Sequence, residues 1–494
     1  MRFLFSLVLA LVLISASAMA NVCCQDVHGN SQVHPHRCLR HQTQVAMSVC
    51  QPPPPACDVF DYGAKGNGTA NDTKSIQAAI DDCASQGGGT VSLHDGIFLS
   101  GTITLADNII FTLSPTATLK GSVHDRDYPA LMADPNNSQV QKNCQKALVY
   151  TNGANNVVIE GGGTIEGNGE DPHWLDRKHH DERTRPMAVY AALSSQVTIR
   201  HLTVKNAAMW GVVILESDHV QINNVIVDNR DAHYDSMKPK GRTRDGIDIV
   251  DSEEVLIEDT TVSSEDDSIC VKSGLPAGAP RSGVRNLSVR HCWVLGSQAA
   301  NGLKLGTASQ GSFRHIHFDT ITVKGVKQAA MAVESVDGAA ISDVTFNNIK
   351  ISESGSLAYL ILGAREKSSV GSISNVRFEN IVGATLNQGS AISGTNGTGD
   401  GVTYYPTNIF FKNVRVTVPG GLQKKPPEPV EFSRYDPRTG KGMYPDPKNW
   451  GILPAYGFFL RHLKNVKFDS SSIEASLPDV RTAIHPVDVT GSGF

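Results

Sequence analysis

Residues 243–274 read TRDGIDIVDSEEVLIEDTTVSSEDDSICVKSG, and two features of this stretch decide how the chain is interpreted. The first is a polar residue followed by alternating aliphatic positions, Glu254-Val255-Leu256-Ile257, which predicts a short β-strand. The second is a group of acidic residues set among glycines and β-branched residues; its members are Asp245, Asp248, Asp251, Asp266 and Asp267. The strand pattern indicates the architecture, and the acidic group indicates the chemistry.

The four-residue strand pattern recurs between residues 156 and 468. Its fourth, apolar positions are Ile159, Ile199, Ile222, Ile257, Val289, Phe318, Phe346, Phe378, Phe411 and Phe468. From Ile199 to Phe411 consecutive copies are 23 to 35 residues apart. A unit of two or three short strands cannot bury its apolar face alone and must stack on its neighbours. Helical segments between the strands are nearly absent, and propeller blades need longer repeats. The pattern therefore predicts an all-β fold, a single-stranded right-handed parallel β-helix in which the apolar residues from Ile159 to Phe378 form inward-facing stacks.

A short amphipathic helix is expected near the start of this solenoid. Thr73 can cap it, and its apolar stripe is Ile76, Ala79, Ile80 and Cys83. The glycines at 87–89 end the helix, which could cover the open end of the stack. Four longer segments are expected as insertions that project from one rim of the coils: 125–144, 170–186, 228–244 and 420–454.

The chain start has the features of a secretory signal, namely Arg2, an apolar run over residues 4–14 and small residues at 18–20. The apolar run is shorter than a transmembrane helix needs to be. We expect a signal peptide at 1–20, a Cys/His/Pro-rich leader at 21–57, a β-helix catalytic domain at 58–480 and a C-terminal tail at 481–494. We therefore expect a secreted, extracellular protein with no membrane partner, and we expect it to be a monomer.

Cysteine usage fits export, which permits disulfides. Five of the nine cysteines lie within residues 23–57, and the odd total leaves at least one without a partner in the chain. The leader also contains four histidines, but their spacing matches no metal-site pattern, so a disulfide-tied leader is favoured over a metal site. Five N-x-S/T sequons could carry glycans in a eukaryotic host: Asn67, Asn71, Asn136, Asn286 and Asn396. The net charge of −5 gives no indication of a nucleic-acid partner.

The spacing of the acidic residues predicts that they converge. Asp245 and Asp266 are 21 residues apart, about one coil, so stacking would bring Asp245 beside Asp266 or Asp267 on one face. Neighbouring carboxylates repel one another, so one of them holds its proton more tightly. Acid–base cleavage of a glycosidic bond needs this combination. For Asp248 and Asp251 we favour a different role, in which the side chains cap turns by bonding to the backbone.

These motifs are similar to those of glycoside hydrolase family 28, the polygalacturonases and their relatives. The resemblance covers about residues 58–480. It rests on DVFDYGAKGNG at 58–68, GGGTVSLHDGIFLSG at 87–101, RDGID at 244–248 and DDSICVKSG at 266–274. The last two resemble the family's Asn-Thr-Asp-Gly and Asp-Asp motifs. The resemblance implies a pectin lyase-like β-helix that cleaves α-glycosidic bonds in pectin or a related plant cell-wall polysaccharide with inversion. It also implies Asp266 as general acid and Asp245 and Asp267 as the pair that holds and deprotonates water, with no metal and no cofactor.

Two departures from the family concern substrate binding. Its Gly-His-Gly motif should fall near 297–306, where the chain reads SQAANGLKLG, and its Arg-Ile-Lys motif near 331–338, where it reads MAVESVDG. We expect substrate-binding residues at Asn301, Lys304, Glu334 and Lys272. Lys304 is the nearest replacement cation, although Lys272 is favoured as a partner for a carboxylate of the next coil. Glu334 stands where a cation is expected; it could bind sugar hydroxyls, tune Asp266 or pair with Lys304.

Two other function classes stay open. A calcium-dependent pectate lyase would share the fold, but it needs an Arg or Lys base near its calcium-binding acids, and no clear base is evident. A non-catalytic β-helix that binds glycans would have no activity to lose when Asp266 is replaced.

Overall fold

The computed structural model describes residues 21–25, 31–35, 43–45, 55–175, 180–232, 243–365, 368–387, 389–435, 440 and 443–493. The chain divides into two compact units, Met1–Pro55 and Ala56–Phe494. In the first unit, β1 (Asn21–Gln25), β2 (Ser31–Pro35) and β3 (Thr43–Val45) form an antiparallel sheet in the order β2-β1-β3. The predicted signal peptide and the side-chain pairing of the leader lie outside what the structure describes.

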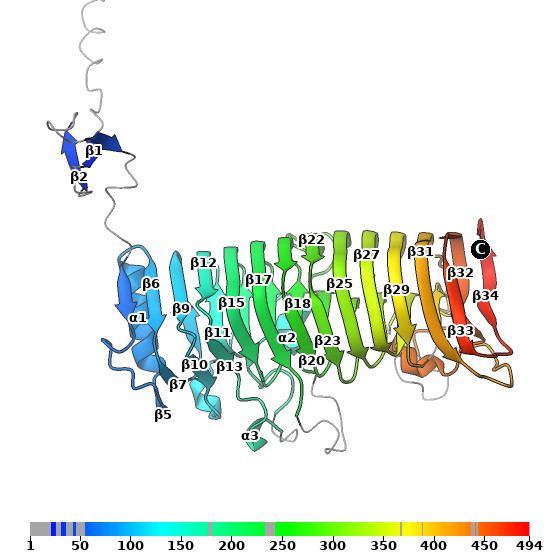
Figure 1. The fold of residues 1–494 in the computed structure, drawn as a ribbon, viewed down its shortest axis with the longest axis horizontal. Coiled ribbons are helices and arrows are strands. Elements are labelled where there is room, and N and C mark those ends of the chain that lie inside the picture. Colours follow the sequence, from blue (N-terminus) through cyan, green and yellow to red (C-terminus); the bar gives the residue numbers. More distant parts are fainter. Residues whose placement is uncertain are drawn as a thin grey trace, which may run out of the picture. The chain divides into compact units, whose positions relative to one another are not determined.

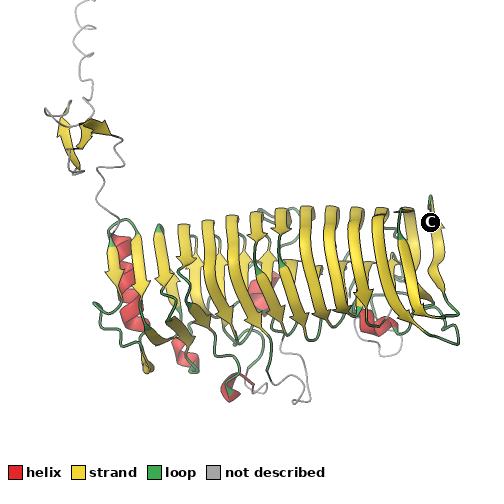
Figure 2. Cartoon of the chain, in the orientation of Figure 1, coloured by secondary structure: helices red, strands yellow, loops and turns green. Residues whose placement is uncertain are grey.

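The second unit is a right-handed parallel β-helix, which confirms the predicted fold class (Figure 1). Its strands join in one 31-stranded sheet in which each coil pairs in parallel with the coils before and after it. Figure 2 shows how little of this unit is helical. Long strands run along two faces of a coil: β15 (Ser195–Lys205), for example, pairs with both β12 (Asn155–Glu160) and β13 (Thr164–Glu166) of the coil before it.

The strands of the first half are β4 (Ala56–Asp58), β5 (Asn67–Asn71), β6 (Gly89–Leu93), β7 (Gly96–Ser100), β8 (Ile103–Leu105), β9 (Ile109–Leu113), β10 (Ala117–Gly121), β11 (Ala147–Asn152), β12 (Asn155–Glu160), β13 (Thr164–Glu166), β14 (Met187–Ala192), β15 (Ser195–Lys205), β16 (Val212–Leu215), β17 (Asp218–Asn229), β18 (Ile247–Val250), β19 (Glu253–Glu258) and β20 (Thr261–Ser264). Those of the second half are β21 (Ile269–Ser273), β22 (Val284–Arg290), β23 (Trp293–Ser297), β24 (Leu303–Ser309), β25 (Phe313–Val326), β26 (Ala329–Ser335), β27 (Ala340–Ser354), β28 (Ser356–Leu362), β29 (Ser372–Thr385), β30 (Ser390–Ser393), β31 (Thr407–Gly420), β32 (Ala455–Asp469), β33 (Ser472–Leu477) and β34 (Thr482–Thr490).

The predicted inward stacks are confirmed. Ile159 pairs with Ile199, and the register continues through Ile222, Ile257, Val289, Phe318, Phe346, Phe378, Phe411 and Phe468. The five phenylalanines form a ladder of nearly parallel rings with centroids 4.9, 5.2, 4.8 and 4.3 Å apart. The fourth position of each repeat thus builds one continuous line of the core.

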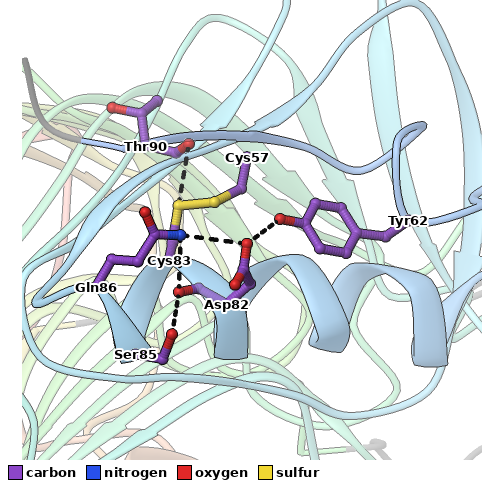
Figure 3. The surroundings of a disulfide bond; sticks show 7 residues. All are labelled: Cys57, Tyr62, Asp82, Cys83, Ser85, Gln86 and Thr90. Atoms are coloured by element: carbon purple, nitrogen blue, oxygen red, sulfur yellow. Dashed lines mark hydrogen bonds between the residues drawn. A yellow bond between two sulfur atoms is a disulfide. The ribbon is translucent and has the colours of Figure 1, made fainter.

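The predicted N-terminal helix is α1 (Thr73–Ser85), and its buried residues are the four expected, Ile76, Ala79, Ile80 and Cys83. The N-cap is Asp72 and not Thr73, because the Thr73 hydroxyl accepts a hydrogen bond from the amide of Gly101 at 2.7 Å. A disulfide between Cys57 and Cys83 ties β4 to α1 (Figure 3). The remaining cysteines of the second unit, Cys144, Cys270 and Cys292, are buried and reduced.

Two domain boundaries differ from the prediction. Cys57 was expected in the leader, but the solenoid unit begins at Ala56, with β4. Residues 481–494 were expected as a tail, but β34 (Thr482–Thr490) pairs in parallel with β32 and continues the β-helix. Its sequence lacks the four-residue pattern because this last strand is half exposed along most of its length.

The insertions carry the remaining helices of the described part of the chain. They are η2 (Asp125–Asp127), α2 (Ser138–Lys142), α3 (Pro172–Leu175) and η3 (Pro447–Trp450). Figure 1 shows α3 and the orange segment before β32 beyond the same edge of the coils. Among the described residues, no helix has the length and apolar character that a membrane crossing requires.

Candidate active site

Coil stacking brings the predicted catalytic acids together. β18 pairs with β21 so that Ile247 lies beside Ile269, and the Gly246 amide donates to the Asp267 carbonyl at 2.9 Å. Asp245 therefore lies beside Asp267 on the next coil. A Cβ atom at Gly246 would come within 2.4 Å of a Val262 methyl and 2.5 Å of the Ser268 carbonyl, so this close approach requires glycine.

The three carboxyl groups form one cluster at the floor of a cavity. One carboxylate oxygen from each of Asp245, Asp266 and Asp267 lies within 4.8 Å of the other two. Asp266 is partly exposed and lines a cavity of about 790 Å³, whereas Asp245 and Asp267 are buried. Of the three acids, Asp266 is the one among the described lining residues, so a ligand in the cavity meets this carboxyl group.

Asp267 is held in its ionised form. Both the backbone amide and the side-chain Nδ2 of Asn301 donate to its Oδ1 at 3.0 Å, and Lys304 Nζ lies 2.9 Å from its Oδ2. Burial works against ionisation, but Lys304 and Lys272 outweigh it and keep the pKa of Asp267 below its ordinary value. Asn301, which replaces the family's histidine motif, thus holds the carboxylate.

The pKa of Asp266 is shifted in the opposite direction. Burial, together with the negative charges of Asp245 and Asp267, raises the pKa of Asp266 well above its ordinary value. No hydrogen bond from another described residue restrains its carboxyl group. Two adjacent residues in the chain therefore differ in protonation, with the protonated one facing the cavity.

Lys272 lies beneath the cluster and contacts the carboxylates of both Asp245 and Asp248. Its Nζ also lies 3.8 Å from the centroid of the Trp210 ring. Pairing with carboxylates of the neighbouring coil was the favoured structural reading, and the contacts agree with it. Lys272 is not among the described residues that line the cavity, so its position does not support the predicted contact with substrate.

The two other acids of the stretch have different roles. Asp251 accepts hydrogen bonds from the amides of Gly274, Leu275 and Gly283, which confirms backbone capping. Asp248 was predicted to cap a turn, and this prediction is wrong. Asp248 lies inside β18, fully buried, and contacts Lys272. Its position in a strand interior makes it part of the charge network below Asp245.

Glu334 and Lys304 form an ion pair in place of a free cation. Lys304 Nζ lies 3.7 Å from Glu334 Oε2, and the Thr307 hydroxyl donates to the same oxygen at 2.7 Å. Burial raises the pKa of Glu334 to about 7, although Lys304 opposes this shift. Because Lys304 also binds Asp267, its charge is already shared by two carboxylates. Both residues line the cavity, as does Asn301.

Sequence reasoning missed the residues that wall the cavity. The insertion at 420–454 supplies Tyr444, Asp446, Pro447, Lys448, Asn449, Trp450 and Leu453 to the lining. The Trp450 ring packs edge-on against Tyr359, with ring centroids 5.6 Å apart, and the Tyr444 hydroxyl lies 2.9 Å from that of Thr307. The signal was the composition of this insertion, rich in Pro, Lys and Tyr, but composition alone gave no position for it.

One further lining residue bears on specificity. Lys327 follows β25 and is exposed at the cavity edge. Of the three lysines in the lining, Lys304 is paired with Asp267 and Lys448 contacts Asp446. Lys327 is the one for which the described part of the chain shows no ion pair, so its ammonium is available to an anionic ligand.

The fold is shared with solved bacterial enzymes. The chain matches an exopolygalacturonase from Thermotoga maritima with a TM-score of 0.58 at 20% identity, covering 74% of this chain and 88% of that one. It matches a polygalacturonase from Erwinia carotovora ssp. carotovora with a TM-score of 0.57 at 19% identity, covering 74% and 94%. At these identities the likeness concerns the fold.

The chain is also similar in sequence to curated enzymes named for the cleavage of polygalacturonate. The chain is 27% identical over 277 residues to the exo-poly-alpha-D-galacturonosidase of Dickeya chrysanthemi, covering 46% of this chain and 44% of that protein. It is 25% identical over 248 residues to endopolygalacturonase I of Aspergillus oryzae, covering 43% and 65%. The chain spans about half the length of the curated relatives it matches. The model of glycosyl hydrolases family 28 matches residues 98–353, more than half of the 494 residues and the span that contains all three acids, so the chain belongs to glycosyl hydrolases family 28.

Proposed function

We propose that this protein is an inverting glycoside hydrolase that cleaves α-glycosidic bonds in pectin or a related plant cell-wall polysaccharide. The observation that carries the proposal is the position of two adjacent acids whose pKa values are shifted in opposite directions by their surroundings. Asp266, whose pKa is raised by burial and by Asp245 and Asp267, faces the cavity, while Asp267 beside it stays ionised. Family membership supports the same reaction class.

In the proposed mechanism, Asp266 gives its proton to the oxygen of the leaving sugar. Asp267, with Asp245, holds a water molecule and removes its proton as the water attacks the anomeric carbon. Lys304 and Lys272 keep Asp267 ionised while the adjacent acid is protonated. The chain thus provides the proton donor and the base from two adjacent residues, with Asp245 added from the neighbouring coil.

The separation of the acids does not by itself give the stereochemistry. Inverting enzymes have carboxyl groups about 6.5–9.5 Å apart, and retaining enzymes about 5–5.5 Å apart. Here the three groups lie within 4.8 Å, because they come from neighbouring strands. The anomer formed at the start of hydrolysis, followed by NMR, tests inversion directly. Retention of configuration would refute this part of the proposal.

The substrate class is proposed from the Lys304–Glu334 pair. A galacturonate carboxylate at that position would meet Glu334 and a lysine already shared by two acids. We therefore expect poor turnover of unsubstituted polygalacturonate relative to a branched or mixed backbone. Product analysis over a panel of pectic and hemicellulosic polysaccharides tests this, and robust turnover of pure polygalacturonate would contradict it unless Lys327→Ala abolishes that activity.

A calcium-dependent lyase reaction is disfavoured by charge. Lys272 and Lys304 already neutralise the acids to which calcium would bind. Hydrolysis should therefore resist chelators and give saturated products, whereas a lyase would lose activity and give unsaturated ends. The features of residues 1–20 also support export of the enzyme to an extracellular polysaccharide; mass spectrometry of secreted protein should show cleavage after residue 20.

A further inference from the structure

Two insertions bring a pair of histidines and an aspartate together away from the acids of the cavity. Asp125 begins η2 in the insertion at 125–144, while His173 in α3 and His180 belong to the insertion at 170–186. His173 Nε2 lies 3.2 Å from Asp125 Oδ2, and His180 Nδ1 lies 3.8 Å from Asp125 Oδ1. One donor atom from each of the three residues lies within 4.8 Å of the other two.

We propose that Asp125, His173 and His180 bind a zinc ion. Zinc favours imidazole nitrogen and carboxylate oxygen at about 2.0–2.1 Å in a tetrahedron, which places neighbouring donor atoms about 3.3 Å apart. The His173 nitrogen lies 3.2 Å from one Asp125 oxygen and the His180 nitrogen 3.8 Å from the other, so each imidazole faces its own oxygen of the carboxylate. Three protein donors leave a fourth position for water. This proposal is independent of the hydrolase mechanism.

The surroundings support a ligand role for His173. Its Nε2 is shielded from solvent, and the contact with Asp125 lacks hydrogen-bond geometry, so this nitrogen has no hydrogen-bond partner among the described residues. The two imidazole rings have centroids 4.4 Å apart, and Trp174 packs edge-on against both at 4.7 and 5.2 Å. An apolar ring on this side restricts the orientation of the donors and lowers access of water.

One neighbouring charge opposes a cation at this place. Lys146 Nζ lies 3.6 Å from Asp125 Oδ1 and is largely buried. Its ammonium competes with zinc for the same carboxylate, so it should weaken the affinity without removing the donors. Removal of this charge should therefore strengthen zinc binding, a response that a merely structural histidine pair would not give.

The site would connect the two insertions to the edge of the cavity. The insertion at 170–186 ends near Arg185, whose Nη2 donates to the Thr243 hydroxyl at 3.2 Å and whose Nη1 donates to the Ala208 carbonyl at 2.9 Å. Thr243 lines the cavity that contains Asp266. Zinc would thus stabilise one border of the cavity and take no part in proton transfer.

The test uses the full chain after EDTA treatment, titrated with zinc by calorimetry. Wild type and His219→Ala should bind the same number of zinc ions, because His219 is exposed and its ion pair in the described part of the chain is with Asp218. His173→Ala and Asp125→Asn should each lose one equivalent, and Lys146→Met should bind on the order of tenfold more tightly. Unchanged stoichiometry in folded His173→Ala, or unchanged affinity in Lys146→Met, would overturn the proposal.

Cobalt separates this site from the cysteines and histidines of the leader. A cobalt ion held by two histidines and a carboxylate gives visible d–d absorption without the thiolate charge-transfer band of a cysteine site. The d–d absorption should be lost in His173→Ala and in the more conservative His173→Gln. Far-UV circular dichroism checks that both variants are folded. Cobalt absorption that persists in both variants would assign the metal to another place.

Discussion

Asp266 is the residue on which the proposed reaction depends most directly. Asp266→Asn keeps the shape of the side chain and removes the transferable proton, so the rate on the identified substrate should fall by about 10² to 10⁴. Asp95→Asn is a matched control, because among the described residues its carboxylate bonds to the hydroxyls of Ser114 and Thr116, near the start of the solenoid. Initial rates of reducing-end release measure both. Intact turnover in Asp266→Asn would show that another group is the acid.

The pH profile follows from the protonation of the same two acids. Activity needs Asp267 ionised and Asp266 protonated, so the rate rises as pH passes the lowered pKa of Asp267 and falls as pH passes the raised pKa of Asp266. Lys304→Met removes a cation that lowers the pKa of Asp267. The acidic limb of kcat/KM should therefore move to higher pH. A shift of that limb to lower pH, or none, would contradict the role given to Lys304.

The convergence of the three acids could be predicted from the sequence because one coil separates Asp245 from the Asp266–Asp267 pair. Their partners were harder to predict. The sequence left three roles open for Glu334, and only the 3.7 Å contact with Lys304 decides for an ion pair. Asp248 was misassigned because a charged residue is unexpected inside a buried strand. Its partner Lys272, which makes burial of the carboxylate possible, lies on the next coil and was not evident from the sequence. The residue pattern within one strand does not show which charged residue of the next coil will pair with it.

At the scale of elements, the phenylalanine ladder makes a quantitative prediction. Phe346 is fully buried between Phe318 and Phe378, at 4.9 and 5.2 Å. Phe346→Ala should lower the free energy of unfolding by about 3–5 kcal/mol, because it leaves a cavity with two unstacked faces. Urea denaturation followed by fluorescence measures the loss.

Two controls separate packing from general effects of substitution. Phe346→Leu retains most of the volume and should cost clearly less than Phe346→Ala. Val382→Ala changes an aliphatic residue that is 51% exposed in β29, and it should change stability by less than about 0.5 kcal/mol. Equal losses for Phe346→Ala and Val382→Ala would mean that the ladder does not stabilise the solenoid.

The ladder was predictable, whereas the last coil was not, and burial explains the difference. Ile159 through Phe411 repeat because each is packed between two neighbouring coils. In β34 only one side meets a neighbour, so the apolar pattern weakens and Pro486 is tolerated in the strand. The walls of the cavity escaped prediction for a related reason. Tyr444 and Trp450 belong to an insertion without periodicity, which gives no register against the coils.

The whole molecule depends on how the two ends of the solenoid are covered. At the start, α1 packs against β4, β6 and β8 and is tied to β4 by the Cys57–Cys83 disulfide. At the other end, β34 lies against β32. A parallel stack without such covers presents unpaired backbone groups and apolar side chains, which favours association between molecules. A helix covers the first end of the solenoid, and a half-exposed strand covers the other.

This difference gives a prediction about truncation. Removal of residues 482–494 deletes β34 and exposes β32, including Leu460 and Leu463, which are fully buried. The truncated chain should melt at a lower temperature and associate at micromolar concentration. Removal of residues 21–55 deletes the separate first unit but keeps β4 and the Cys57–Cys83 disulfide, so the melting temperature of the solenoid should stay the same. Calorimetry and light scattering on the two truncated chains measure both effects. If the chain without residues 482–494 melts at the same temperature as the full chain, β34 contributes nothing to the solenoid, and residues 481–494 behave as the expected tail.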